Sequence, residues 1–132
     1  MATDNRVIDI SFEADEDLSA DQYKIVVLDA TSGKVRRPNA ATDIPLGVLQ
    51  NAPLAGEAAV VRPIGCGGIS LVQASAALGI GVIVGMEFVG AADAGKAQAA
   101  VITQYPVGVL LSASDAEDDL CSMLMSPLTV KA

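Results

Sequence analysis

The chain has 132 residues, of which 52% are hydrophobic and only 3% aromatic, and it carries a formal net charge of −8 with no histidine. A chain of this length forms a single domain whose core is large enough to need no metal or disulfide. The acidic excess argues against nucleic acid and against an anionic membrane surface as partners, because both attract cationic proteins.

Residues 1–22 hold seven acidic residues and one arginine, and we expect them to form an arm ahead of a compact domain of residues 23–132. Within this arm the segment RVIDISFE alternates polar and apolar residues, which predicts an extended strand with Ile8, Ile10 and Phe12 on one face. Two interpretations stand at this point. The strand joins the domain's own sheet, or it adds to the sheet edge of a partner.

The segments after the arm read as short strands separated by polar turns. Strands at 23–29 and 34–37 around a Gly33-Lys34 turn predict a hairpin, and strands at 46–50 and 58–62 form a second pair. The glycine-rich stretch 65–91 predicts two or three more strands, with a short helical turn at 72–78 as the alternative. Its apolar core, residues 76–86, is about half the length that spans a bilayer, so we expect buried strands there.

Next along the chain, GAADAGKA (residues 90–97) resembles a phosphate-binding loop. Ala97, however, stands where a Ser or Thr hydroxyl would bind magnesium. The lack of histidine removes the usual base of a nucleophilic triad, and two distant cysteines, Cys66 and Cys121, do not make a zinc site. We expect both cysteines to be free and buried, and the acidic loop 115–119 to face solvent. The sequence therefore predicts no enzymatic activity, no cofactor and no metal.

One motif, Pro-x-Gly-Val-Leu, occurs twice. Its residues are Pro45, Gly47, Val48 and Leu49, then Pro106, Gly108, Val109 and Leu110. Each copy follows a Gly-Lys pair, at 33–34 and at 95–96, so residues 23–63 and 81–130 read as two copies of one β unit. In each copy proline opens a strand, glycine permits close approach and Val-Leu packs in the core. We predict a mainly β domain, a small barrel or sandwich with short helical turns.

Several segments between residues 18 and 128 carry a resemblance to a known family. In order, GVLQNAPLAGEAAVV, GGISLVQASAALGIGVIVG and ADAGKAQAA followed by PVGVLLSA are similar to segments of the small capsid decoration, or cement, proteins of tailed bacteriophages. The resemblance implies the lambda-type decoration fold. It also implies a homotrimer that binds the major capsid protein at three-fold and local three-fold positions on the outside of the expanded capsid and stabilises that shell.

In such proteins the N-terminal segment commonly reaches toward the capsid. The resemblance would give that role to five residues: Arg6, Val7, Ile8, Ile10 and Phe12. The protein would be made in the host cytoplasm and located on the virion. The alternative function is a small β-barrel module on a virion that binds a receptor or a carbohydrate.

Overall fold

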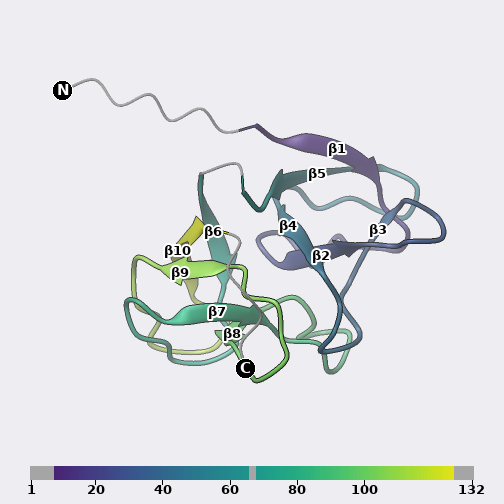
Figure 1. The fold of residues 1–132 in the computed structure, drawn as a ribbon. Helices are drawn as coiled ribbons and strands as arrows, with labels where there is room; N and C mark the ends of the chain where they lie inside the picture. Colours follow the sequence, from purple (N-terminus) through teal and green to yellow (C-terminus); the bar gives the residue numbers. More distant parts are fainter. Residues whose placement is uncertain (1–7, 66–67, 127–132) are drawn as a thin grey trace.

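The computed structural model describes residues 8–65 and 68–126, and these form ten strands with no helix (Figure 1). The first sheet contains β1 (Ile10–Glu13), β2 (Ile25–Leu28), β3 (Val35–Arg36), β4 (Pro45–Leu49) and β5 (Ala58–Pro63). The second sheet contains β6 (Ile69–Gln73), β7 (Ile83–Met86), β8 (Ala97–Ala99), β9 (Gly108–Leu110) and β10 (Leu120–Met125). All the strand pairs within the two sheets are antiparallel. The predicted mainly β fold is confirmed, and neither sheet closes into a barrel.

The two sheets have the same topology. The strand order is β1-β5-β4-β2-β3 in the first sheet and β6-β10-β9-β7-β8 in the second. Each strand of the second sheet therefore has the same place in its sheet as the strand numbered five lower has in the first sheet, so that β6 corresponds to β1 and β10 to β5. We call residues 10–63 the first repeat and residues 69–125 the second repeat.

Backbone details repeat together with the strand order. Ala14 forms an isolated parallel bridge with Val35, and Ala74 forms the same bridge with Ala97. The Gly-Lys turns also correspond, since Gly33 and Gly95 have φ angles of 70° and 92°. The unit thus begins at β1 and β6, earlier than the motif-based boundaries at residues 23 and 81 predict.

Most predicted strands lie close to those observed, but the buried strands expected over residues 76–86 are only partly present. Residues 76–81 are largely exposed and lie outside the named strands, and β7 (Ile83–Met86) begins only after them. Val27 of β2 faces Arg36 of β3, which confirms the first hairpin, and β4 pairs with β5 as predicted. Val72 and Gln73 belong to β6, so the alternative of a helical turn at 72–78 is wrong. In the part of the chain that the structure describes, no helix is long and apolar enough to cross a membrane.

Gly47 and Gly108 explain the glycine of the repeated motif. A Cβ added to Gly47 would collide with the carbonyl oxygen of Arg62 on β5, and one added to Gly108 would collide with that of Leu124 on β10. Any side chain here would force the neighbouring strand away, because its Cβ and the carbonyl oxygen cannot occupy the same space. The close approach that the sequence predicts for this glycine is confirmed in both repeats.

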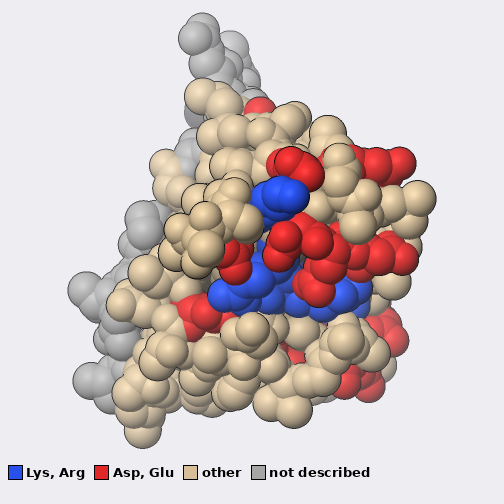
Figure 2. Space-filling view, turned by 90° about the vertical axis from the view of Figure 1, so that its right-hand side faces the viewer, with Lys and Arg blue, Asp and Glu red and all other residues tan. Residues whose placement is uncertain are grey.

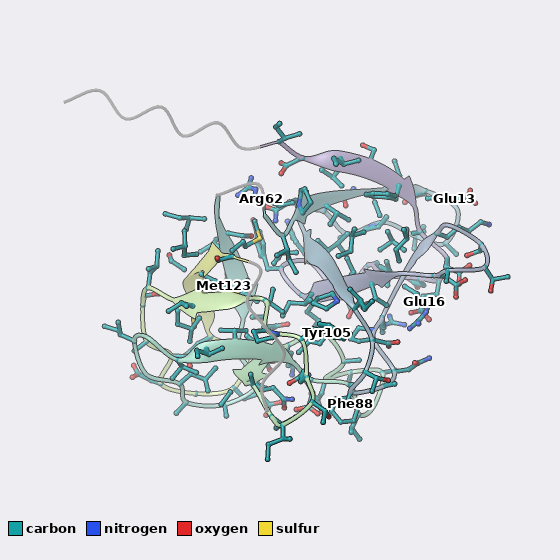
Figure 3. All side chains as sticks on the ribbon, in the orientation of Figure 1. Glu13, Glu16, Arg62, Phe88, Tyr105 and Met123 are labelled. Atoms are coloured by element: carbon teal, nitrogen blue, oxygen red, sulfur yellow. The ribbon has the colours of Figure 1, made fainter. Side chains whose placement is uncertain are left out.

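Two clusters of buried side chains form the interior. The first-repeat core lies within the first repeat and contains Ala14, Leu18, Val26, Val35, Leu49, Ala59 and Val61. The shared core joins Ile25, Val27 and Val48 of the first sheet to the inward face of the second sheet, which includes Met123 (Figure 3). Val48 and Leu49 are neighbours on β4 but belong to different clusters, so both faces of the first sheet carry buried residues.

The N-terminal segment is described from residue 8 onward, and its later part is packed into the fold. β1 is the edge strand of the first sheet, where Ile10 faces Val61 and Phe12 faces Ala59 of β5. Beyond β1, Leu18 and Asp21 are buried. In the described residues, therefore, β1 pairs within its own sheet.

Candidate interaction surfaces

The five residues assigned to capsid contact occupy different environments. Arg6 and Val7 lie outside the described residues. Ile8 and Ile10 are exposed, with 65% and 42% of their surface accessible, whereas Phe12 packs partly buried against the first-repeat core. An ion pair between Asp9 and Arg62, with 3.0 Å from Oδ1 to Nε, holds the start of β1 against β5. The apolar face predicted for this strand is thus buried at Phe12 and open at Ile8 and Ile10.

The eight residues of the repeated motif form part of the scaffold in each sheet. All are buried except Val109, which is partly exposed. Pro45 is the first residue of β4, as predicted for a residue that cannot donate a ladder hydrogen bond, and Pro106 lies just ahead of β9. The structure places the two motifs in different sheets and does not bring them together in one site.

A band of cations surrounded by acids crosses one face of the molecule (Figure 2). We call it the charged seam, and it contains Asp21, Lys24, Arg37, Asp93, Lys96, Glu117 and Asp118. Within the second repeat, Lys96 Nζ lies 2.7 Å from Asp93, 2.9 Å from Glu117 and 2.7 Å from Asp118. Lys96 is almost fully buried, so its ammonium group depends on these carboxylates to replace water.

Lys24 connects this seam to the first repeat. Its Nζ donates to Asp21 Oδ1 at 2.9 Å and to the carbonyl oxygen of Ala92 in the second repeat at 2.8 Å. Arg37 reaches the other oxygen of Asp21 at 2.7 Å, and the Ile25 amide donates to the Gly95 carbonyl at 2.7 Å. The charged seam therefore joins the two repeats by direct contacts, around a cavity of about 490 Å³ lined by both.

The contacts of Lys96 change the electrostatics of the seam. Burial by itself lowers the pKa of Lys96, but hydrogen bonds to Asp118, Asp93 and Glu117 outweigh burial and raise that pKa above its usual value. The hydrogen bond and charge of Lys96 in turn lower the pKa of Asp93. Both groups thus stay charged over a wide pH range.

The contacts of Lys96 also involve two segments singled out in the sequence, the loop 90–97 and the acidic loop 115–119. The loop 90–97 forms turns with no helix after it in the described chain, and its lysine is occupied by carboxylates, so the geometry of a phosphate-binding loop is absent there. The acidic loop 115–119 is mostly exposed as predicted, but Glu117 and Asp118 pair with Lys96 instead of facing water alone. Sequence reasoning missed this cluster because residues 93 and 118 are far apart in the chain.

Cys121 is a free thiol buried on β10, and burial raises its pKa. Cys66 lies outside the described residues, so the structure does not test whether the two sulfurs are close. Among the residues that are described, no group of three or more His, Cys, Asp or Glu side chains is arranged to hold a metal ion.

The outward face of the second sheet is an exposed apolar surface. Ile69 of β6 faces Leu124 of β10, Leu124 faces Val109 of β9, and Val109 faces Ile83 of β7. We call these four cross-strand neighbours the apolar row, and Leu71, Leu111 and Leu120 are also exposed on these strands or next to them. The strands of the second sheet contain no charged residue, although the whole chain is 18% charged. An apolar surface of this kind marks a contact with another molecule more often than a solvated face.

Comparison with known proteins identifies the fold. No protein-family model matches the chain, and no curated protein matches it. Among solved structures, the chain is similar to the crystal structure of the head fiber gp8.5 N base in bacteriophage phi29, with a TM-score of 0.65 and 15% sequence identity. That likeness covers 94% of this chain and 99% of the phi29 chain. The shared fold thus extends over both repeats.

Proposed function

We propose that this chain is a structural protein of a bacteriophage head and works without catalysis or a cofactor. The observation that supports this most directly is the likeness to the phi29 head fiber base, which covers 94% of this chain and nearly all of that one. The resemblance of its sequence segments to capsid decoration proteins points to the same part of a virion.

Within that role, the chain acts as a homotrimer on the outer surface of the expanded capsid, at three-fold and local three-fold positions, with the major capsid protein as its partner. The sequence resemblance supports this finer assignment. The net charge of −8 is consistent with it, because an acidic protein is repelled by packaged DNA and suits the exterior of the shell.

Binding of this kind stabilises the shell by mass action. A ligand that binds only the expanded shell stabilises it by RT ln(1 + [L]/Kd), or about 4 kcal/mol per site at a thousandfold excess over Kd. A trimer whose three subunits all reach the shell gains further through effective concentration. This function requires complementary surface and no reactive centre.

The capsid contact is assigned to residues 1–8, which include Arg6, Val7 and Ile8. Ile8 is 65% exposed and lies just before β1, the edge strand of the first sheet. Phe12 packs against the first-repeat core and Ile10 pairs with β5, so a deletion that reaches residue 12 would remove an edge strand as well as any contact. A deletion of residues 1–8 leaves β1 and both partners of the Asp9–Arg62 ion pair in the chain, and so separates the two effects.

The test is to mix the purified chain with capsids of its phage that lack decoration, both expanded and unexpanded. Electron cryo-microscopy should show added density at three-fold positions of the expanded shell only, and decorated shells should survive higher temperatures. The variant lacking residues 1–8 should keep its thermal unfolding midpoint but lose binding. Absence of density on expanded capsids would contradict the proposed function, whereas full binding by the truncated variant would contradict only the role of residues 1–8.

A further inference from the structure

The first sheet contains a counterpart of the apolar row. The corresponding positions in the first repeat are Asp9, Arg62, Val48 and Ile25, since Val48 faces Arg62 as Val109 faces Leu124. Val48 and Ile25 are fully buried in the shared core, where the second repeat covers them. In the first sheet, the second repeat thus covers Val48 and Ile25 on this face. In the second sheet, the equivalent face is exposed to solvent.

The contact between the repeats shows how such a face is covered. The edge strand β6 lies against the first sheet, where Gln50 Nε2 donates to Ser70 Oγ at 2.9 Å and Arg62 Nη1 donates to the Ile69 carbonyl oxygen at 2.9 Å. Arg62 lies between β5 and the upper end of β6 in Figure 3. The Gln73 amide also donates to the Tyr23 carbonyl oxygen at 2.8 Å. The arrangement is head-to-tail, because the edge of one unit meets the face of the other.

Each side of this contact has an equivalent at the surface. Gln50 corresponds to Leu111, since their amides donate to Val60 and Ser122 at equivalent sites, both at 2.8 Å. Leu111 is 44% exposed, and Leu124, the counterpart of Arg62, is 38% exposed. On the other side, Ser70 corresponds to Ile10, because Ser70 faces Met123 as Ile10 faces Val61.

The two residues in this contact are both polar inside the chain and both apolar at the equivalent surface positions. Inside the chain the contact is a polar pair, Gln50 with Ser70, and at the surface both equivalents are apolar, Leu111 and Ile10. Two exposed apolar side chains at matching positions fit each other, since each removes the other from water.

We propose that the β1 edge of one copy of this chain packs onto the apolar row and the adjacent Leu111 of a second copy, with Ile10 against Leu111, in the head-to-tail arrangement that joins the two repeats within each chain. Such an interface uses two different surfaces, so it generates a closed ring when the rotation between copies allows it. That the ring has three members rests on the proposed function, which includes a homotrimer. The contact between two copies does not depend on that function. The experiment uses the purified chain alone, so its outcome is independent of capsid binding.

The test is a double-mutant cycle on self-association, measured by sedimentation velocity over a range of concentrations. Leu111→Gln and Ile10→Ser each give a surface position the residue of its counterpart in the other repeat. We expect each single variant to raise the dissociation constant about tenfold, because one side becomes polar without a partner. The double variant regains the Gln–Ser hydrogen bond, so its dissociation constant should stay within about tenfold of wild type instead of rising about a hundredfold.

The control is Ile44→Gln, which removes an apolar side chain that is 67% exposed and outside both surfaces, and it should leave association unchanged. Circular dichroism checks that each variant is folded, and if Ile10→Ser disturbs β1, then Leu111→Gln with its control still tests the apolar row. Additive effects of the two substitutions, or an unaltered dissociation constant for Leu111→Gln, would overturn the proposal. A monomeric wild type would overturn it as well.

Discussion

At the scale of single residues, the repeat is set by backbone crowding more than by side-chain chemistry. Gly47 and Gly108 each stand directly beside a backbone carbonyl of the next strand, so no other residue fits without moving that strand. Positive φ angles recur as well, at Gly56 and Asp118 and at Tyr23 and Gly81, although the residue types differ. The glycine of the sequence motif therefore marks an equivalent position at which no larger residue fits, whereas equivalent positive-φ positions carry different residues and leave no motif.

This crowding leads to a matched set of substitutions. Gly47→Ala and Gly108→Ala should each lower the free energy of unfolding by about 3 kcal/mol, because overpacking against backbone forces a strand shift. The corresponding fall in Tm is about 10 °C, measured by circular dichroism. Gly79→Ala is the control, since its new Cβ would lie 4.0 Å from Val82 and should change stability by less than about 1 kcal/mol. A Gly47→Ala protein as stable as this control would show that the strands are not held this closely.

At the scale of elements, how far sequence reasoning succeeds depends on the signal that each element carries. Turn residues and alternating patterns identify β2 to β5 closely. The equivalence of β1 and β6 is missed, because the two strands share no sequence motif. It shows only in their place in the sheet and in the matching bridges of Ala14 and Ala74 directly after them. The apolar row is also missed. A largely apolar segment such as LCSMLM does not show which of its two faces is exposed, the face with Leu124 or the one with Met123 and Met125.

The charged seam gives a prediction on pH dependence at this scale. The pKa of Asp93 is lowered in the folded state, so its contribution to stability is present above 3.8, the ordinary pKa of an aspartate, and is lost as pH falls through the folded pKa. The pKa of Lys96 is raised, so its contribution is lost only as pH rises through that raised pKa. The seam thus stabilises the fold from mildly acidic to alkaline pH.

Lys96→Met tests this, with Tm measured from pH 2 to pH 8. At neutral pH the variant should melt well below wild type, because Asp93, Glu117 and Asp118 then repel one another without a cation. The difference should shrink as pH falls below about 4, where carboxylates become protonated. Lys34→Met is the control, since its ion pair with Glu13 is largely exposed and contributes little. A Tm difference that does not depend on pH would show that Lys96 acts through packing and not through charge.

At the scale of the whole molecule, the two repeats depend on each other for a complete interior. The shared core contains residues of both repeats. On the first sheet these are Ile25, Val27 and Val48, whose side chains pack against the second repeat. The Lys24 and Ile25 contacts to Ala92 and Gly95 add hydrogen bonds at the same junction. We therefore expect the chain to unfold as one cooperative unit.

Val48→Ala examines this cooperativity. The loss of buried methyl groups should lower the free energy of unfolding by about 2 kcal/mol. Hydrogen exchange should become faster at protected amides of β9 and β10 as well as of β4, since both sheets open together. Leu54→Ala, in an exposed loop, should leave both sheets unchanged. If only the first sheet exchanged faster in Val48→Ala, the repeats would be separate folding units.

The identical strand order of the two sheets also has a consequence for how the chain avoids misfolding. β4 and β9 carry the same Gly-Val-Leu segment, so either strand fits the slot of the other, within one molecule or between two crowded ones in a domain swap. Their neighbours differ, since β5 offers Arg62, which needs Asp9, while β10 offers Leu124. An exchange that carried β5 into the place of β10 would set the Arg62 guanidinium between Ile69 and Val109 without Asp9, and that mismatch favours the native partners over the swapped ones.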